Sequence, residues 1–314
     1  MLDQLMQRFI PEYLSVRMRM QVDYITRLFG DGVGGVHLEN IDAIFPLMEA
    51  GLRVSGLWKR GLANMLKHVV SEQTFQIPNL PPAFDGVRVL HLSDLHIDVD
   101  PKYHISMGAR FADAIRPLSF DVAVITGDFR FATFGPYDRV HPEVQDMMPA
   151  LDCELGVYGI LGNHDFIEQV PYLEDVGVKM LVNEAAPLER DGEQLWLVGV
   201  DDPHFYGLHS FGMALMNVPD DACKLMLIHS PEIAEEALEN GGALYLTGHT
   251  HGGQLCLPGG MAPYVNARCP RERVCGRWQH GSMHGYTSAG TGSSGLPVRF
   301  NRPPEIAIHT LVRG

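Results

Sequence analysis

The stretch VRVLHLSDLH, residues 87–96, decides the fold, because an apolar run of strand length leads there into two metal-binding side chains, Asp94 and His96. Short apolar runs of this kind are typical of buried β-strands. The same form recurs along the chain, and each run leads into a polar residue that can bind a metal. The other runs are 122–125 before Asp128, 156–161 before Asn163, 225–228 before His229 and 244–246 before His249.

Segments of helical pattern separate several of these runs, which predicts a mixed α/β sandwich. In open α/β sheets, functional sites usually lie at the carboxyl ends of the strands, where the polar residues collect in this sequence. The expected helices are 107–118, 142–150, 170–176 and 231–240, and further strands are expected at 195–200 and 306–312.

The polar residues that follow the runs have the donor types of a site for two divalent cations. Residues two apart on a strand share a face, so Asp94 and His96 can chelate one ion. An extended backbone would likewise let His249 and His251 reach adjacent ions, and the two oxygens of Asp128 can bridge them. The candidate metal ligands are Asp94, His96, Asp128, Asn163, His229, His249 and His251.

Composition excludes some classes of function. The 314 residues include 38 acidic and 24 basic side chains, for a net charge of -14, which argues against a nucleic-acid partner. No apolar run approaches the ~20 residues that span a bilayer, and the first ten residues lack the apolar core of a signal peptide. Five cysteines without a CxxC pair indicate reduced thiols, so we expect a cytoplasmic location.

Residues 1–80 have helical periodicity and are expected to form a helical N-terminal extension, which Pro78, Pro81 and Pro82 separate from a catalytic domain at 81–314. The segment 54–69 is amphipathic and its polar side is basic. Such a helix can lie on an anionic membrane surface, which would make residues 1–75 a peripheral contact with the inner membrane. Packing against the protein's own core or another subunit explains the same pattern, and the sequence favours no oligomeric state.

Taken together, these motifs resemble the calcineurin-like metallophosphoesterase superfamily over roughly residues 84–312. The segment GHTHGGQ, residues 248–254, and the tail LPVRF, residues 296–300, are similar to a bacterial phosphodiesterase branch of it. Some members of that branch hydrolyse UDP-2,3-diacylglucosamine in lipid A synthesis. The resemblance implies a four-layer αββα sandwich with a dinuclear metal site.

The resemblance also implies a role for each motif residue. It assigns Asp94, His96 and His251 to the first metal and Asn163, His229 and His249 to the second, with Asp128 as the bridge. His164 would face the substrate and donate to a phosphoryl oxygen or to the leaving group. Asp165 is expected either to orient His164 or to cap a helix.

One position departs from the family pattern, since many relatives carry a second acidic or amide residue shortly after Gly-Asp. Here Arg130 follows, and its guanidinium could bind a substrate phosphate or pair with a local acid such as Asp138. Residues 255–286 form a long insertion near the expected site, and loops of this length are often functional. It is expected to cover the site and contribute Arg271, Arg273 and His284 to substrate binding, or else to be a solvated loop.

The expected activity is metal-dependent hydrolysis of a phosphoric ester, in which a metal-activated hydroxide attacks in line without a covalent enzyme intermediate. Mixed oxygen and imidazole donors favour Mn²⁺, with Fe or Zn as alternatives. A phosphodiesterase or pyrophosphatase acting on a lipid-linked nucleotide such as UDP-2,3-diacylglucosamine is the leading hypothesis. A broad phosphomonoesterase or protein phosphatase is the second, and a non-catalytic binding module on the same scaffold is the third.

Overall fold

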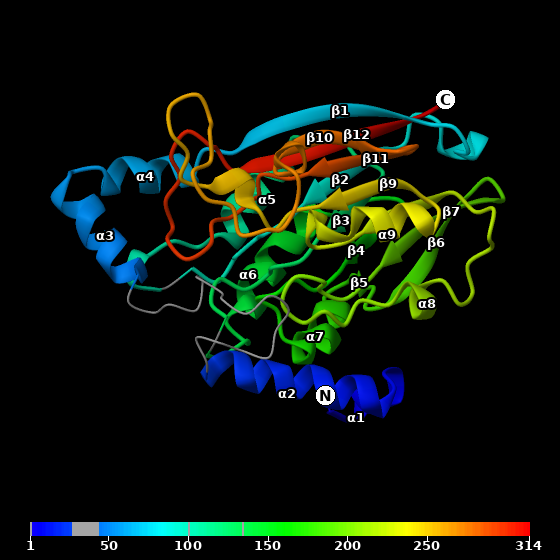
Figure 1. The fold of residues 1–314 in the computed structure, drawn as a ribbon, viewed down its shortest axis with the longest axis horizontal. Coiled ribbons are helices and arrows are strands. Elements are labelled where there is room, and N and C mark those ends of the chain that lie inside the picture. The colour runs from blue at the N-terminus through cyan, green and yellow to red at the C-terminus, as the bar shows by residue number, and fades with distance from the viewer. Residues whose placement is uncertain (1, 27–43, 100, 134) are drawn as a thin grey trace.

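Two six-stranded sheets form the centre of the molecule, seen in a computed structural model that describes residues 2–26, 44–99, 101–133 and 135–314 (Figure 1). The first sheet is parallel except where β12 meets β2, and the second is parallel except at its two outermost pairs. The first sheet has the order β1 (Val69–Ile77), β12 (Glu305–Arg313), β2 (Arg88–Leu92), β3 (Val122–Ile125), β4 (Val157–Gly159), β5 (Val178–Met180). The second has the order β10 (Gly276–His280), β11 (Met283–Thr287), β9 (Gly242–Thr247), β8 (Lys224–Leu227), β7 (Glu193–Gly199), β6 (Glu184–Arg190).

The central strands are apolar on both faces, so their side chains contribute to three core layers. One layer lies between the two sheets, and the other two lie between each sheet and the helices that cover it. On β2, Val89 packs between the two sheets, whereas Leu90 packs beneath the helices that cover the first sheet. On β8, Leu225 and Leu227 face the other sheet, and Met226 faces the helices on the far side. The first sheet is covered by α5 (Gly108–Ile115), α6 (Val140–Met147) and α7 (Val170–Asp175), and the second by α8 (Phe211–Ala214) and α9 (Ala234–Glu239). The predicted four-layer sandwich is therefore confirmed.

The N-terminal helices divide into two pairs. The first pair, α1 (Leu2–Arg8) and α2 (Pro11–Thr26), lies against the helical side of the first sheet, where Leu5 and Leu14 of the helices and Phe9 between them are buried. The second pair, α3 (Ile44–Val54) and α4 (Trp58–Met65), lies apart from the first, at the left of the view and beside a long loop (Figure 1). None of the described helices is long and apolar enough to cross a bilayer.

Two expectations about elements are wrong. The helical pattern assigned to residues 1–80 does not hold for 69–77, which form strand β1 beside β12, with Phe75 and Ile77 turned into the core. The insertion 255–286 is a loop in its first part, but 276–280 and 283–287 are the hairpin strands β10 and β11. In both cases pairing with a distant strand outweighs the weak local pattern.

Candidate metal centre

The candidate ligands follow the carboxyl ends of β2, β3, β4, β8 and β9, so the two sheets deliver them to one place. The two-residue spacing of these ligands predicts an extended backbone, but the backbone there is not extended. Asp94 and His96 have φ of 51° and 40°, and His249 and His251 have φ of 67° and 51°. Asp128 also has a left-handed backbone, with φ of 57°. Non-glycine residues rarely adopt this conformation, and such local strain tends to collect at functional sites.

Glycines let these tight loops approach one another. A Cβ atom on Gly248 would lie 1.8 Å from Oγ of Ser93 and 2.2 Å from Oδ2 of Asp94. A Cβ on Gly127, whose φ is 90°, would lie 2.6 Å from the backbone nitrogen of Gly162. Side chains at these two positions would therefore push the ligand loops apart.

The potential ligand atoms form three overlapping groups, and Asp128 belongs to two of them. The groups are Asp94, His96 and His251; His96, Asp128 and His164; and Asp128, His229 and His249, with all ligand atoms of a group within 4.8 Å of one another. Oδ2 of Asp128 lies 3.4 Å from Nε2 of His229 and 3.7 Å from Nε2 of His96, so this carboxylate stands between the groups.

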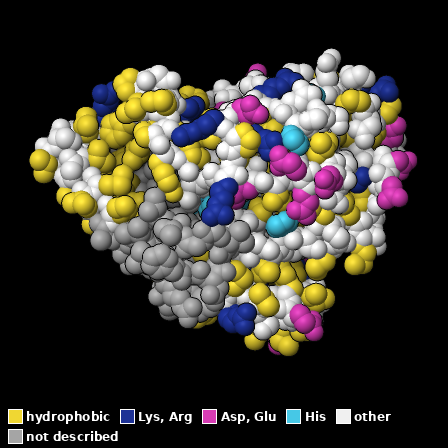
Figure 2. All heavy atoms as spheres, viewed as in Figure 1, with side chains coloured by type: hydrophobic (Ala, Val, Ile, Leu, Met, Phe, Trp, Pro, Cys, Tyr) yellow, Lys and Arg dark blue, Asp and Glu magenta, His cyan; other side chains and the backbone are white. Residues whose placement is uncertain are grey.

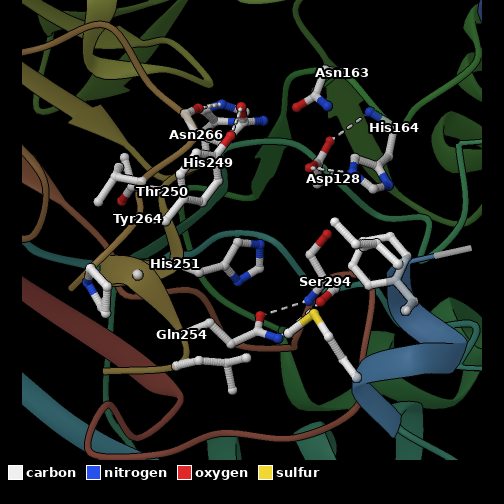
Figure 3. A pocket seen from close by; sticks show the side chains of 17 residues that line it. Asp128, Asn163, His164, His249, Thr250, His251, Gln254, Tyr264, Asn266 and Ser294 are labelled. Carbon is white, nitrogen blue, oxygen red and sulfur yellow. Dashed lines mark hydrogen bonds and ion pairs between the residues drawn. The ribbon is translucent and has the colours of Figure 1, made fainter. Parts of the chain in front are cut away.

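Asn163 completes the arrangement from the β4 side. Its Oδ1 lies 3.1 Å from Nε2 of His229, and Figure 3 shows Asn163, Asp128 and His164 across the pocket from His249 and His251. The structure thus brings together all the residues expected to bind metal.

The second nitrogen of most of these imidazoles is held by a backbone carbonyl. Nδ1 of His96 lies 2.5 Å from the Arg130 oxygen, and Nδ1 of His229 lies 2.8 Å from the Thr126 oxygen. Nε2 of His249 lies 2.5 Å from the Asn266 oxygen. A carbonyl that accepts a hydrogen bond from the N–H of one ring nitrogen leaves the lone pair of the other nitrogen available to a metal, so these residues fit a bound metal ion.

His251 differs from the other imidazoles. Its Nδ1 lies 3.2 Å from Nη2 of Arg299, which can only donate. A neutral imidazole that accepts at Nδ1 carries its proton on Nε2, so coordination through Nε2 requires that this contact change.

Burial controls the charge of the site. It lowers the pKa of His96 to about 3 and the pKa values of His249 and His251 well below their usual range, which keeps these imidazoles neutral. Burial has the same sense at His229, but the Asp128 carboxylate outweighs it and raises the pKa of His229 to about 10. Metal binding at His229 must therefore displace a proton.

Asp165 has a role that neither sequence interpretation anticipated. Its carboxylate accepts hydrogen bonds from the backbone N–H groups of Asp128 (2.8 Å), Phe129 (2.9 Å), Arg130 (3.2 Å) and Gly162 (2.9 Å). It thereby ties the loop after β3 to the loop after β4. The partner of His164 is instead the carbonyl of Phe131, 3.0 Å from Nδ1.

The four side chains expected to bind substrate do not line the cavity that opens from the ligand cluster. Arg130 is buried, donates to the carbonyls of His164 and Gly135, and lies over the Phe166 ring. The remaining three bond elsewhere: Arg271 to the Ala262 oxygen, Arg273 to Glu235, and His284 to the Gln76 oxygen.

A cavity of about 410 Å³ opens from the ligand cluster, and much of its wall is apolar. Sequence reasoning missed most of that wall, because Tyr264 and Asn266 lie in a loop without periodicity. His204 lies beside the ligands, with its ring 4.0 Å from the ring of His249 and its Nδ1 3.0 Å from Oε2 of Glu232. The apolar part of the wall comprises Ile44, Phe45, Met48, Leu255, Pro263, Tyr264 and Val265.

Comparisons with known proteins agree with this geometry. The family model of calcineurin-like phosphoesterases matches residues 87–253, which contain all the candidate ligands. The chain is 27% identical over 281 residues to the metallophosphoesterase YkuE of Bacillus subtilis, covering 86% of this chain and 96% of that protein. It is 28% identical to the phosphodiesterase YaeI of Escherichia coli, covering 72% and 82%.

A vertebrate relative is similar over a smaller share of its length. A transmembrane protein with a metallophosphoesterase domain from Danio rerio is 29% identical over 250 residues, which cover 73% of this chain and 54% of that protein. Since the family model spans more than half of the chain and every ligand type is in place, the chain belongs to the calcineurin-like phosphoesterase family and is a metal-dependent phosphoester hydrolase.

Proposed function

We propose that the enzyme is a phosphodiesterase or pyrophosphatase whose substrate is amphiphilic, a lipid-linked nucleotide such as UDP-2,3-diacylglucosamine. One observation carries the proposal: the cavity has the ligand cluster on one wall and apolar side chains on the other. Phe45 and Met48 of α3 and Leu255 of the loop after β9 line the same space as Asp128 and His249. A substrate that fits both walls carries a phosphoryl group close to an acyl chain.

The site uses the donors of a two-metal hydrolase. Mixed carboxylate, amide and imidazole donors favour Mn²⁺, with Fe or Zn as alternatives. When bound, two such ions activate a water molecule and neutralise the phosphoryl oxygens. Asp94, His96 and His251 would hold one ion and Asn163, His229 and His249 the other, with Asp128 shared between them.

His164 is the proposed proton donor to the leaving group. Its Nδ1–H donates to the Phe131 carbonyl, so the proton for the leaving group has to come from Nε2 of the imidazolium form, and Nε2 faces the pocket 3.9 Å from Oδ2 of Asp128. We expect His164→Ala to lower turnover by ~10²–10⁴-fold while metal content stays at the parent level. Because His164 also lies in a geometric group with His96 and Asp128, loss of metal from this variant would identify it as a ligand instead.

A substrate panel tests the proposal. Rates on bis-p-nitrophenyl phosphate and p-nitrophenyl phosphate, each with several metals, separate diesterase from monoesterase activity. UDP-2,3-diacylglucosamine and UDP-N-acetylglucosamine share a diphosphate but differ in acyl chains, so we expect the acylated substrate to be preferred. A strong preference for the monoester would contradict the proposal and favour a phosphomonoesterase or protein phosphatase.

The apolar wall has its own test. Phe45→Ser should raise the KM for UDP-2,3-diacylglucosamine about tenfold, since a buried aromatic ring contributes on the order of 1.5–3 kcal/mol. The rate on bis-p-nitrophenyl phosphate, which has no acyl chain, should change little. Equal effects on both substrates would show that Phe45 acts through the structure of the site.

A further inference from the structure

We infer that α3, α4 and the loop 255–266 form a docking face for an anionic lipid bilayer, at the mouth of the metal-site cavity. The docking face is defined by exposed apolar side chains from these two parts of the sequence. They are Leu47, Met48, Val54, Leu57, Leu257, Met261 and Tyr264.

Helix α3 is apolar but buries none of its residues. Its sequence is IFPLMEAGLRV, and Leu47 and Val54 are 73% and 91% exposed. Figure 2 shows hydrophobic side chains gathered over α3 and α4, at the upper left of the view. Contiguous exposed apolar surface of this kind marks a site of interaction with a protein or a membrane.

The loop adds a second apolar segment beside the helices. Met261 and Tyr264 are 62% and 52% exposed. Met48 of α3 and Tyr264 of the loop are both exposed and both line the cavity, so the docking face borders its mouth.

Charge favours a membrane as the partner. Lys59, Arg60 and Lys67 are exposed on or beside α4, and the sequence has no acidic residue between Arg53 and Val70. The chain as a whole carries a net charge of -14 and would be repelled by an anionic surface elsewhere. Apolar side chains flanked by lysine and arginine are the pattern that anionic headgroups attract.

Packing against the protein's own core explains part of the amphipathic stripe, but not its exposed side. Trp58 and Met65 of α4 are buried, and Trp58 packs on Leu296 and Val298 of the same chain. Val54 and Leu57, which precede them, stay exposed. The inner residues thus fix the helix to the domain, and the outer ones remain available to lipid.

This arrangement would let a lipid-linked substrate enter the cavity without leaving its leaflet. Only this route for the substrate rests on the proposed function. Docking itself depends on the exposed side chains and does not require any particular phosphoester substrate.

Co-sedimentation of the full, metal-loaded chain with vesicles tests the inference. We expect binding to phosphatidylcholine vesicles that contain phosphatidylglycerol, weaker binding to phosphatidylcholine alone, and weakening by salt. The double variant Leu47→Glu/Val54→Glu should lower the partition coefficient about tenfold or more, since both side chains would otherwise enter the interface. Lys59→Glu/Arg60→Glu should lower it by a similar factor.

The matched control is Met6→Glu/Met216→Glu, which changes two exposed methionines outside the docking face, 58% and 75% exposed. It adds the same charge as the first variant and should bind like the parent. Equal binding by Leu47→Glu/Val54→Glu and the parent, or no binding of the parent to anionic vesicles, would overturn the inference.

Two further outcomes have distinct meanings. In the first, the parent is a dimer and Leu47→Glu/Val54→Glu is a monomer, while vesicle binding is unchanged. This result would identify the face as a contact between copies of the chain and would overturn docking. Hydrolysis of bis-p-nitrophenyl phosphate in solution should be unchanged in that variant. A protein that binds vesicles but is inactive on every phosphodiester would contradict the proposed function and still support docking.

Discussion

Asp128 is placed so that both groups of candidate ligands depend on it. Its Oδ2 faces Nε2 of His229 and of His96, and its Oδ1 accepts a hydrogen bond from the backbone N–H of His164. The imidazoles of His229 and His164 outweigh the effect of burial and lower the pKa of Asp128 well below its usual range, so it is ionised at neutral pH.

Replacing Asp128 by Ala should therefore remove both metals and the activity. Loss of an outer-shell partner costs ~10–100-fold in metal affinity, and loss of the bridging ligand should cost more. Metal titration by calorimetry and turnover on bis-p-nitrophenyl phosphate measure the two effects. The exposed Asp152 supplies a control variant, Asp152→Ala. Full metal occupancy together with parent activity in Asp128→Ala would refute the bridge.

Gly248 is the position where a single methyl group should do most harm to the site. Its Cβ would overlap Ser93 and Asp94, so we expect Gly248→Ala to lower metal affinity and to destabilise the fold by ~1–3 kcal/mol. Gly51→Ala in α3 is the matched control, because a Cβ there has no neighbour within 4 Å. Thermal unfolding with and without Mn²⁺ compares them, and equal behaviour of the two variants would show that the loops adapt.

At the scale of elements, α2 is tied to the metal site through Arg17. This side chain is fully buried, and its Nε donates to Oδ2 of Asp201 at 2.9 Å. Its Nη2 donates to the carbonyl of Asp165 at 3.1 Å, and Asp165 holds the loops of Asp128 and Gly162. The helix therefore supports the loops that carry the ligands.

We expect Arg17→Met to cost ~3–5 kcal/mol of unfolding free energy, because it leaves Asp201 as a buried charge without its partner. The double variant Arg17→Met/Asp201→Asn should recover part of that loss, which urea denaturation can measure as a double-mutant cycle. If Arg17→Met stays within about 1 kcal/mol of the parent, the ion pair does not hold α2 in place.

Sequence reasoning located the elements whose pattern is local. The runs before Asp94 and His229 and the helices near 108–115 and 170–175 have clear periodicity, and all form as expected. Sequence reasoning did not locate strand β1, because its first two residues, Val69 and Val70, are exposed, the polar residues 71–74 follow them, and its conformation depends on pairing with β12.

The candidate site shows the same division. The types and order of the metal-binding residues were readable, because each follows an apolar run. Their left-handed backbone could not be predicted, because tertiary contacts such as those of Asp165 hold it against the local conformational preference. The contacts of Arg273 and His284 likewise depend on partners far away in the sequence.

At the scale of the whole molecule, a buried pair of histidines makes stability depend on pH. Nδ1 of His91 lies 3.1 Å from Nε2 of His309, and both rings are buried. Burial lowers the pKa of His91 to about 3 and that of His309 well below its usual range. The folded protein keeps both neutral, whereas the unfolded chain takes up protons below about pH 6.5.

Stability should therefore be complete above pH 6.5 and fall as the pH drops toward 3, because the unfolded state binds more protons in that window. His91 alone should contribute about 2 kcal/mol of this loss at pH 5. Urea unfolding of the metal-free parent and of His91→Gln between pH 7 and pH 5 measures the difference. A parent and variant with the same pH slope would show that this histidine is not kept neutral by folding.

Strand β12 separates β1 from β2, although residues 69–77 and 88–92 are close in sequence and 305–313 lie far from both. During synthesis the first sheet consequently lacks the strand between β1 and β2 until residues 305–313 have been made. Strands β1 and β2 have unpaired edges until residues 305–313 pair with them, so we expect completion of this sheet to be a slow step of folding.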